Sequence, residues 1–391
     1  MKVFYVSKFD WLGTGPMSTV STMFTHAISR QNIKTVYITQ SEKCEQSAAT
    51  TANDLLNKRY GIVPDSNYSI HLFRKFTLIR SSTLFYLRAL KYILLNARPG
   101  DIIYTRNSTF LPYLYVAKIL KKSKIYFEAH GYHGSQNTSK KKYSNRYNLT
   151  ENLFMGRIDG ICSLTNAMSR LFEKDFPKLP ILTLPLGARP VSEQLRIDTS
   201  KGFAARRLCY IGRCTDNIDT LTIFKAISIC KSKDIKFLWI GVTAQQKNKL
   251  NQIADEFQIT NQIELIEWLS YREMCETVHA KASAGIVAYT DSYESNVQIS
   301  PTKLFDFFSF GMPVLGSKVG AVEEITGKDL DSFLYQPGNA SDLASKITAL
   351  FDSFQTYCRC CKISSDMGQI YTWENRAKRF LDFASTKSGI I

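Results

Sequence analysis

SPTKLFDFFSFGMPVLGSKVGAVEEI, residues 300–325, is the stretch that decides the fold. Ser300 and Pro301 are typical of a helix start, because Ser caps a helix N-terminus well and Pro suits its first position. Apolar residues at helical spacing follow, Gly311 predicts the helix end, and PVLGS (313–317) has the pattern of a buried strand. A helix that leads directly into a buried strand is the repeating unit of a parallel α/β sheet.

The start of this helix also predicts an anion site. The backbone N–H groups around Thr302 and the positive charge of Lys303 favour a phosphate at the helix N-terminus. One turn further on, Asp306 can accept hydrogen bonds from both hydroxyls of a ribose. The same residues also fit an ordinary capped helix with a Lys and an Asp in solvent, and the residues alone do not decide between these interpretations.

Short apolar runs alternate with amphipathic segments along the rest of the chain. A polar patch at 192–206 separates two such series, so we predict an α/β protein with two Rossmann-like, doubly wound parallel-sheet domains at 1–190 and 204–370. The hinge is expected near residues 188–205. The strands expected in the two series are VFYVS (3–7), TVYIT (35–39), DIIYT (101–105), KIYFEAH (124–130) and GICSL (160–164), then RLCYIG (207–212), KFLWIG (236–241), IELIEW (263–268), AGIVAY (284–289) and PVLGS (313–317).

Composition narrows the class of protein. The chain has 391 residues and a formal net charge of +16, and residues 1–200 hold 28 Lys and Arg against 13 Asp and Glu. This asymmetry points to an anionic partner for the first half. The N-terminus lacks the pattern of a signal peptide and no run of apolar residues is long enough to span a membrane, so a cytoplasmic protein is expected. The nine cysteines are expected to be reduced thiols, and the CRCC run at 358–361 lacks the second pair of a zinc site.

Polar residues at strand ends in the first half are candidates for binding. Gly13, Thr14 and Gly15 follow the first strand, where they fit either a close approach to a phosphate or acceptor, or merely a tight turn. His130 ends a strand and is expected to point toward a ligand or to be a structural His. Arg106 ends another strand and fits an acceptor phosphate or a nearby acid equally well.

Nearly the whole chain resembles the GT4-type glycosyltransferases, whose GT-B fold has two such domains facing across a cleft. The donor-site signature is carried by the 300–325 stretch, and YIGR (210–213) resembles the strand and loop with a diphosphate-binding Arg, here Arg213. The order of the remaining pieces supports the resemblance. They are IELIEWLSYREM (263–274) for the nucleobase, IYFEAHG (125–131) for an active-site His, LTLPLGA (182–188) for the domain end and WENRAKRF (373–380) for a last helix, 371–387, that packs back on the first domain.

The resemblance implies a metal-independent transferase that moves a sugar from a UDP- or GDP-linked donor, with retention and with no cofactor. His130, Arg213 and Lys303 would be catalytic, Arg213 and Lys303 by neutralising the leaving diphosphate. The implied acceptor is a saccharide or a polyprenyl-diphosphate-linked saccharide in surface polysaccharide or lipopolysaccharide assembly. The residues that the resemblance assigns to the donor are Asp306, Gln298, Ser300, Pro301, Thr302, Leu304, Glu267, Trp268 and Glu294.

Three departures from the family pattern leave the donor open. Gln298 stands where many members carry the first of two Glu, Asp219 stands where a Lys often follows the Arg of YIGR, and Arg189 replaces an Asp after the LPLG turn. Glu294 fits either the donor sugar or solvent. Two alternative functions therefore remain, a sugar-nucleotide 2-epimerase of the same fold and a catalytically degenerate scaffold protein.

Segment 73–95 mixes basic and aromatic residues, and KKSK (121–124) and KKK (140–142) add positive charge. A basic amphipathic stretch suits an anionic bilayer surface, although it also fits a core-facing helix with a solvated basic side. We expect peripheral contact with the cytoplasmic face of the inner membrane. No nucleic-acid-binding module is recognisable, so nucleic acid is not an expected partner.

Overall fold

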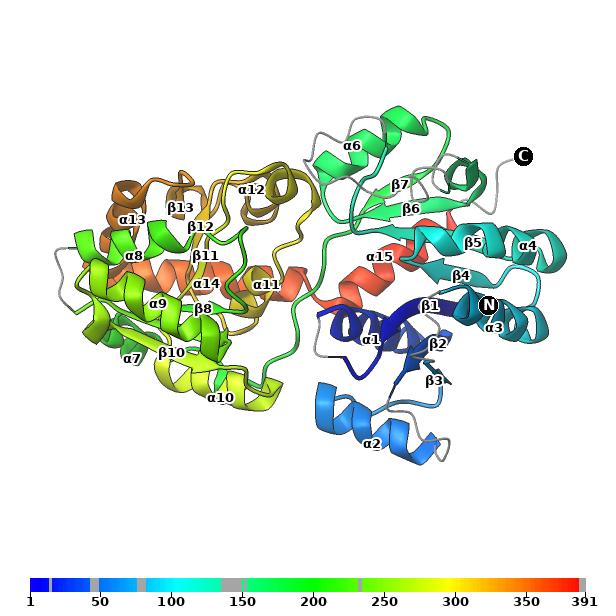
Figure 1. Cartoon of the computed structure of the whole chain (residues 1–391), viewed down its shortest axis with the longest axis horizontal. Coiled ribbons are helices and arrows are strands. Elements are labelled where there is room, and N and C mark those ends of the chain that lie inside the picture. The colour runs from blue at the N-terminus through cyan, green and yellow to red at the C-terminus, as the bar shows by residue number, and fades with distance from the viewer. Residues whose placement is uncertain are drawn as a thin grey trace. The chain divides into compact units, whose positions relative to one another are not determined.

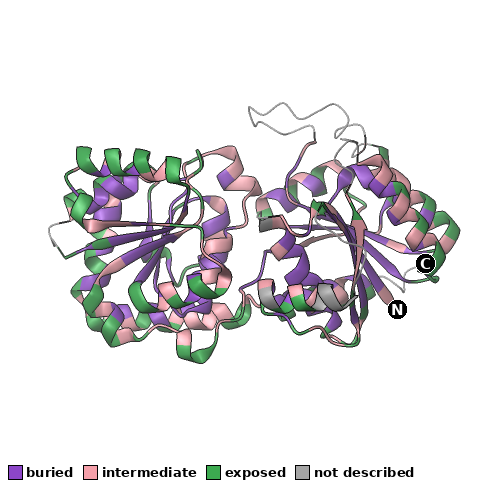
Figure 2. Ribbon diagram, turned by 60° about the horizontal axis from the view of Figure 1, so that its bottom comes forward, coloured by how far each residue is buried: buried purple, intermediate pink, exposed green. Residues whose placement is uncertain are grey.

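A computed structural model of the chain describes residues 1–13, 16–42, 49–75, 82–134, 150, 153–230 and 234–386 (Figure 1). The chain divides into two compact units. The first unit consists of Met1–Pro185 together with Trp373–Ile391, and the second consists of Leu186–Thr372. In each unit the described strands pair in parallel, and buried residues concentrate on them (Figure 2). Because both faces of such a sheet are covered by helices, its strands are continuously apolar, which is the pattern in the sequence.

The first unit contains a seven-stranded sheet of order β3-β2-β1-β4-β5-β6-β7. Its strands are β1 (Lys2–Asp10), β2 (Lys34–Ser41), β3 (Tyr68–Arg74), β4 (Ile102–Thr105), β5 (Lys124–Ala129), β6 (Gly160–Ser163) and β7 (Ile181–Thr183). Its helices are α1 (Pro16–Ser29), α2 (Ala49–Tyr60), α3 (Thr83–Asn96), α4 (Leu111–Lys121), α6 (Asn166–Asp175) and α15 (Trp373–Ser385), with short turns η1 (Ser108–Phe110) and η2 (Met155–Arg157).

Helix α15 belongs to the core of the first unit, although 187 residues of the second unit precede it in the chain. Phe380 lies edge-on to three rings, with centroid distances of 5.9 Å to Phe24, 4.6 Å to Tyr104 and 5.5 Å to Tyr126. Aromatic burial of this kind stabilises a helix on a sheet because edge-to-face contacts add to the area removed from water. The last helix therefore closes the face of the first sheet.

The second unit contains a six-stranded sheet of order β10-β9-β8-β11-β12-β13. Its strands are β8 (Arg207–Ile211), β9 (Lys236–Val242), β10 (Ile263–Glu267), β11 (Ala284–Val287), β12 (Val314–Ser317) and β13 (Leu334–Tyr335). Its helices are α7 (Thr199–Ala205), α8 (Thr220–Ile229), α9 (Ala244–Glu256), α10 (Tyr271–Lys281), α11 (Thr302–Ser309), α12 (Gly320–Thr326), α13 (Ala340–Asp352) and α14 (Phe354–Ile370). Short helical turns are η3 (Glu193–Leu195), η4 (Thr260–Gln262), η5 (Glu294–Gln298) and η6 (Asp331–Phe333).

The structure corrects two positions predicted from the sequence, the boundary between the units and the start of the helix at 300–310. The units divide at residue 185 rather than at 190, because Ala188 N–H donates to the Tyr371 carbonyl at 2.6 Å within the second unit. Helix α11 starts at Thr302 with Pro301, not Ser300, at the cap position. The Ser300 hydroxyl is engaged elsewhere, since its Oγ accepts from Leu186 N–H at 3.3 Å.

The cysteines of the described part are free, and Cys44 lies outside it. None of the helices in the described ranges combines the length and the apolarity that crossing a bilayer requires.

Helix α11 approaches β11 closely because Gly285 has no side chain. A Cβ atom at Gly285 would collide with the ring of Phe307, which is fully buried. We therefore expect Gly285→Ala to lower the free energy of unfolding by about 1–3 kcal/mol, since added methyl groups in a close-packed core force shifts of neighbours. Urea unfolding measures the change.

Gly156→Ala is the matched control, because the nearest side-chain atom to its added Cβ is Phe176 Cδ1 at 3.8 Å. Equal stability of the two variants would contradict the packing described for α11.

Candidate functional site

Each sheet reverses its strand order at one place, and ligands of such sheets bind there, outside the carboxyl ends of the strands. In the second unit the reversal lies between β8 and β11, and in the first unit between β1 and β4. The candidate residues of each unit can therefore be judged by whether they follow these strands.

In the second unit, Gly212 follows β8 and supports the side chain of Lys303. Gly212 has φ +129°, a conformation that side chains disfavour, and a Cβ here would lie 2.7 Å from Lys303 Cε. Its carbonyl accepts from Trp239 Nε1 at 2.7 Å, which fixes the loop. Lys303 Nζ lies 5.4 Å from the ring centroid of Tyr210, so the ammonium lies against the end of β8, where Arg213 follows Gly212 in the chain.

Lys303 and Arg213 thus lie at one edge of the second sheet, together with the N-terminus of α11. Burial lowers the pKa of the Lys303 ammonium, and the Asp306 carboxylate raises it in part. Arg213 is exposed. Two cations and a helix N-terminus at the carboxyl edge of a parallel sheet are able to bind a phosphate or diphosphate.

Asp306 is held by Arg189, a contact that was not predicted from the sequence. Arg189 Nε and Nη2 donate to the two carboxylate oxygens of Asp306 at 3.0 and 3.1 Å. The guanidinium stacks on Tyr271, with 4.0 Å from its central carbon to the ring centroid. The departure of Arg189 from the family pattern was the available signal, because a new Arg beside a site calls for an acid. The ribose role of Asp306 stays a prediction.

The other donor candidates lie on three elements. Glu294 and Gln298 belong to the π-helical turn η5, and Asn217 Nδ2 donates to Glu294 Oε2 at 3.2 Å. Glu267 ends β10 and is followed by Trp268, which is 68% exposed and able to face a ligand. Leu304 is fully buried in the core, so its side chain is not available to a ligand. Ser300, Pro301 and Thr302 form the entry to α11.

Asp219, which stands where the family pattern has a Lys, stabilises the local backbone through hydrogen bonds to its carboxylate. It caps α8, with Thr222 N–H donating to Oδ1 at 3.4 Å, and Gly338 N–H donates to its Oδ2 at 2.8 Å. An Asp at this position therefore stabilises the start of a helix through its carboxylate.

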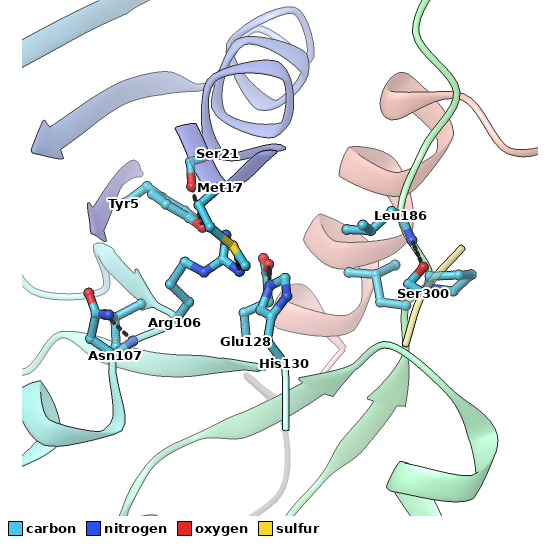
Figure 3. Close-up of polar contacts among 12 residues, drawn as sticks. Tyr5, Met17, Ser21, Arg106, Asn107, Glu128, His130, Leu186 and Ser300 are labelled. Atoms are coloured by element: carbon cyan, nitrogen blue, oxygen red, sulfur yellow. Dashed lines mark hydrogen bonds and ion pairs between the residues drawn. The ribbon is translucent and has the colours of Figure 1, made fainter. Parts of the chain in front are cut away.

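In the first unit, Glu128 is fully buried near the end of β5, and Figure 3 shows it beside His130. His130 Nε2 bonds to Glu128 Oε1, and Arg376 Nη2 lies 3.5 Å from Glu128 Oε2. Arg376 comes from α15 and also donates from Nε to the Pro185 carbonyl at 2.9 Å. Arg376 is not among the residues predicted from the sequence. The Arg in WENRAKRF at a buried helix position was the signal.

The protonation of this group follows from its surroundings. The neighbouring Arg376 and His130 lower the pKa of Glu128 against the opposing effect of burial, so the carboxylate is ionised and can only accept. Burial, with the charge of Arg106, lowers the pKa of His130 from 6.5 to about 4. A neutral His130 must then donate from Nε2 to Glu128, which leaves its Nδ1 as an acceptor for a hydroxyl.

Arg106 directly follows β4 at the reversal of the first sheet. Its side chain is buried, and its Nη2 lies 2.8 Å from Met17 Sδ in α1. Gly13 follows β1 and its N–H donates to the Asp10 carbonyl at 3.1 Å. Thr14 and Gly15 lie outside the described residues. Within the described ranges, no three His, Cys, Asp or Glu side chains gather as a possible metal site.

Two parallel-sheet α/β units of seven and six strands are the architecture of the GT-B glycosyltransferases, and solved structures of that kind match nearly the full chain. The Anabaena protein Alr3699/HepE in complex with UDP and glucose matches with a TM-score of 0.67 and 13% identity over 99% of this chain and 100% of its own. Sucrose-phosphate synthase from Thermosynechococcus elongatus matches with 0.71 and 12% over 98% of both chains. The lipopolysaccharide outer core galactosyltransferase WaaB matches with 0.66 and 14% over 99% of this chain and 100% of its own.

These identities establish the fold alone, which confirms the predicted architecture. Residues 205–353, which run from the end of α7 through the whole of α13, match the family model described as glycosyl transferases group 1. No curated protein matches the sequence significantly. The donor, the acceptor and the narrower GT4 assignment stay predictions.

The pKa of His130 makes a prediction about stability. Between pH 6.5 and about pH 4 the unfolded chain takes up a proton at this His and the folded chain does not. The stability present at neutral pH is therefore lost as the pH falls through this window. We expect His130→Asn to remove about 2–3 kcal/mol of the loss between pH 7 and 4.5. Urea unfolding of both proteins at the two pH values measures it.

Glu128 contributes a loss of the same sign only below its ordinary pKa of 4.5, so it barely affects this comparison. A wild-type protein and a His130→Asn variant with the same pH dependence would show that His130 is not buried in its neutral form.

Proposed function

We propose that the protein is a glycosyltransferase that moves a sugar from a UDP- or GDP-linked donor to a saccharide or lipid-linked saccharide, with retention and without a metal ion. The observation that carries the proposal is the placement of Lys303 over Gly212, beside Arg213 and at the N-terminus of α11. This edge supplies the positive charge that a nucleoside diphosphate requires. The match of residues 205–353 to glycosyl transferases group 1 supports the same assignment.

The proposed chemistry depends on charge at the leaving group. As the glycosidic bond breaks, negative charge develops on the departing diphosphate, and preorganised cations lower the energy of that state. Lys303 is partly desolvated, so its attraction to a phosphate is stronger than in water. Arg213, Lys303 and the helix N-terminus would do what a divalent cation does in other transferases.

Asp306 would hold the ribose hydroxyls of the donor. Its two oxygens accept from Arg189, and a carboxylate has about four lone-pair sites, so it can accept further hydrogen bonds. The stacking of Arg189 on Tyr271 fixes the carboxylate in one orientation. Arg189 would therefore be a positioning residue for the nucleotide.

The first unit would bind the acceptor. Nδ1 of neutral His130 is an acceptor for the proton of a sugar hydroxyl, and Glu128 with Arg376 keeps the ring oriented. Two solved relatives of similar fold indicate the class of substrate. The Anabaena protein was solved with UDP and glucose, and WaaB is named as a lipopolysaccharide galactosyltransferase. A role in surface polysaccharide or lipopolysaccharide assembly follows as part of the proposal.

Thermal stabilisation by nucleotides tests the donor assignment. We expect UDP or GDP, in buffer with EDTA, to stabilise the protein by about 2.7 kcal/mol at a hundredfold excess over the dissociation constant. Lys303→Ala and Arg213→Ala should each weaken the affinity about tenfold or more, because each removes a charge-assisted contact to phosphate.

Lys201→Ala is the control, a Lys in α7 whose side chain is 87% exposed, just before β8 at the amino edge of the sheet. Stabilisation that requires a divalent cation, or equal losses in all three variants, would contradict the proposed site. Product analysis then separates a transferase, which releases free nucleoside diphosphate, from an epimerase.

We also propose that α3 and α4 attach the first unit to an anionic membrane surface. Leu87, Lys91 and Leu95 follow one another at four-residue spacing on α3, and all three are exposed. On α4, Ile119 and Leu120 are 61% and 63% exposed. Apolar side chains with interspersed Lys suit the interface of an anionic bilayer. In segment 73–95, residues 76–81 lie outside the described part, as does 140–142.

Vesicle sedimentation tests this surface. We expect binding to vesicles with anionic lipid, and a loss of about tenfold or more for Leu95→Ser with Ile119→Ser, because each buried apolar side chain contributes about 1.5–3 kcal/mol. Leu221→Ser is the control, since Leu221 is 60% exposed on α8 of the second unit.

Equal binding of the double variant and the control, or equal binding to neutral and anionic vesicles, would exclude α3 and α4 as the attachment surface.

A further inference from the structure

Arg106 is a buried cation that makes no salt bridge with a described carboxylate, although its charge helps to lower the pKa of the nearby Glu128. It is 8% exposed, and its Nη1 has no hydrogen-bond partner among the described residues. Its Nη2 contacts only the thioether of Met17, which is a weak acceptor. The guanidinium carbon also lies 5.4 Å from the ring centroid of Phe9, which offers a cation–π contact and no charge. A buried guanidinium with a vacant donor is costly, so its retention calls for an explanation.

The cluster formed by Arg106, Arg376, Glu128 and His130 has an excess of positive charge. Arg376 is paired with Glu128, and burial keeps His130 neutral at physiological pH. Arg106 therefore contributes one positive charge more than the cluster's single carboxylate can neutralise. Figure 3 shows the Arg106 guanidinium between Met17 and the Glu128–His130 pair, at the ends of β4 and β5.

The position of Arg106 is where a parallel sheet binds ligands. It follows β4, whose neighbour β1 lies on the other side of the reversal of strand order. Met17 lies in the first turn of α1, a 14-residue helix with no acidic residue in that turn. A helix N-terminus adds positive potential to a site beside it. Two independent features, a buried unpaired cation and a helix start, thus converge on one place.

We propose that Arg106 and the N-terminus of α1 form an anion site, and that the acceptor sugar of the proposed transfer carries an acidic group that binds there. The group is a carboxylate or a phosphate, because both offer paired oxygens to the guanidinium fork. This inference rests on the proposed function and narrows the acceptor from any saccharide to an acidic one. Arg106 would select the acceptor by binding its acidic group, while His130 Nδ1 would accept a hydrogen bond from its hydroxyl.

The experiment titrates the full-length protein with inorganic phosphate in the presence of saturating UDP or GDP, whichever binds. The nucleotide fills the site of the second unit, so additional binding reports the first. We expect phosphate to bind wild-type protein under these conditions and to bind Arg106→Gln about tenfold more weakly, as the loss of a charge-assisted hydrogen bond predicts.

Arg98→Gln is the matched control, an exposed Arg that precedes β4 at the opposite end of the same strand, and it should bind phosphate as the wild type does. A second arm compares glucuronate and glucose 6-phosphate with glucose on the wild-type protein. It needs no variant, and it tells a carboxylate acceptor from a phosphate one. Preference for either acidic sugar over glucose supports the inference.

Three results would overturn it. They are no phosphate binding to the nucleotide-saturated wild type, no preference for an acidic sugar, or loss of nucleotide binding in Arg106→Gln. The last result would assign Arg106 to the donor diphosphate instead. If neither UDP nor GDP binds the wild type, the proposed function fails first, and this outcome is distinct from failure of the anion site alone.

Discussion

The contact of α11 with the second sheet is the constraint on which the candidate donor site depends. Lys303 and Phe307 are one turn apart on the same face of the helix, and each lies against a glycine, Gly212 and Gly285. The absent side chains let the helix approach the strands closely. Because Phe307 is fully buried there, the position of the helix start is fixed by core packing rather than by the loop before it.

The first unit uses a different device, a buried ionic cluster that joins distant parts of the chain. Arg376 comes from the last helix, yet it contacts Glu128 of β5 and the carbonyl of Pro185 at the end of the unit. A buried carboxylate without its Arg would be strongly destabilising, so the return of α15 to the first sheet and the orientation of His130 are linked. The same residues thus serve both structure and chemistry, while burial and the charge of Arg106 keep His130 neutral against the opposing effect of Glu128.

Much of the candidate site followed from local pattern, and the errors have physical causes. The helix at 302–309, the strand ends and the position of Lys303 were predictable, because apolar periodicity and glycines report local geometry. The cap at Ser300 was predicted wrongly because its hydroxyl accepts from Leu186, a residue 114 positions away. Arg189 was noticed only as a departure, since nothing local shows that it pairs with Asp306. Leu304 was assigned to the donor, and burial removes its side chain from reach.

The sequence by itself determined the class of fold, two parallel α/β sheets, and the excess of positive charge in the first half. Both are sums over local features, so no contact between distant residues is needed to infer them. Only the tertiary structure decided which charges are paired. Asp306 pairs with Arg189 and Glu128 pairs with Arg376, whereas Arg106 forms no salt bridge in the described part of the chain. Pairing depends on which strand ends and helices meet, and burial then sets the energetic cost of leaving a charge unpaired.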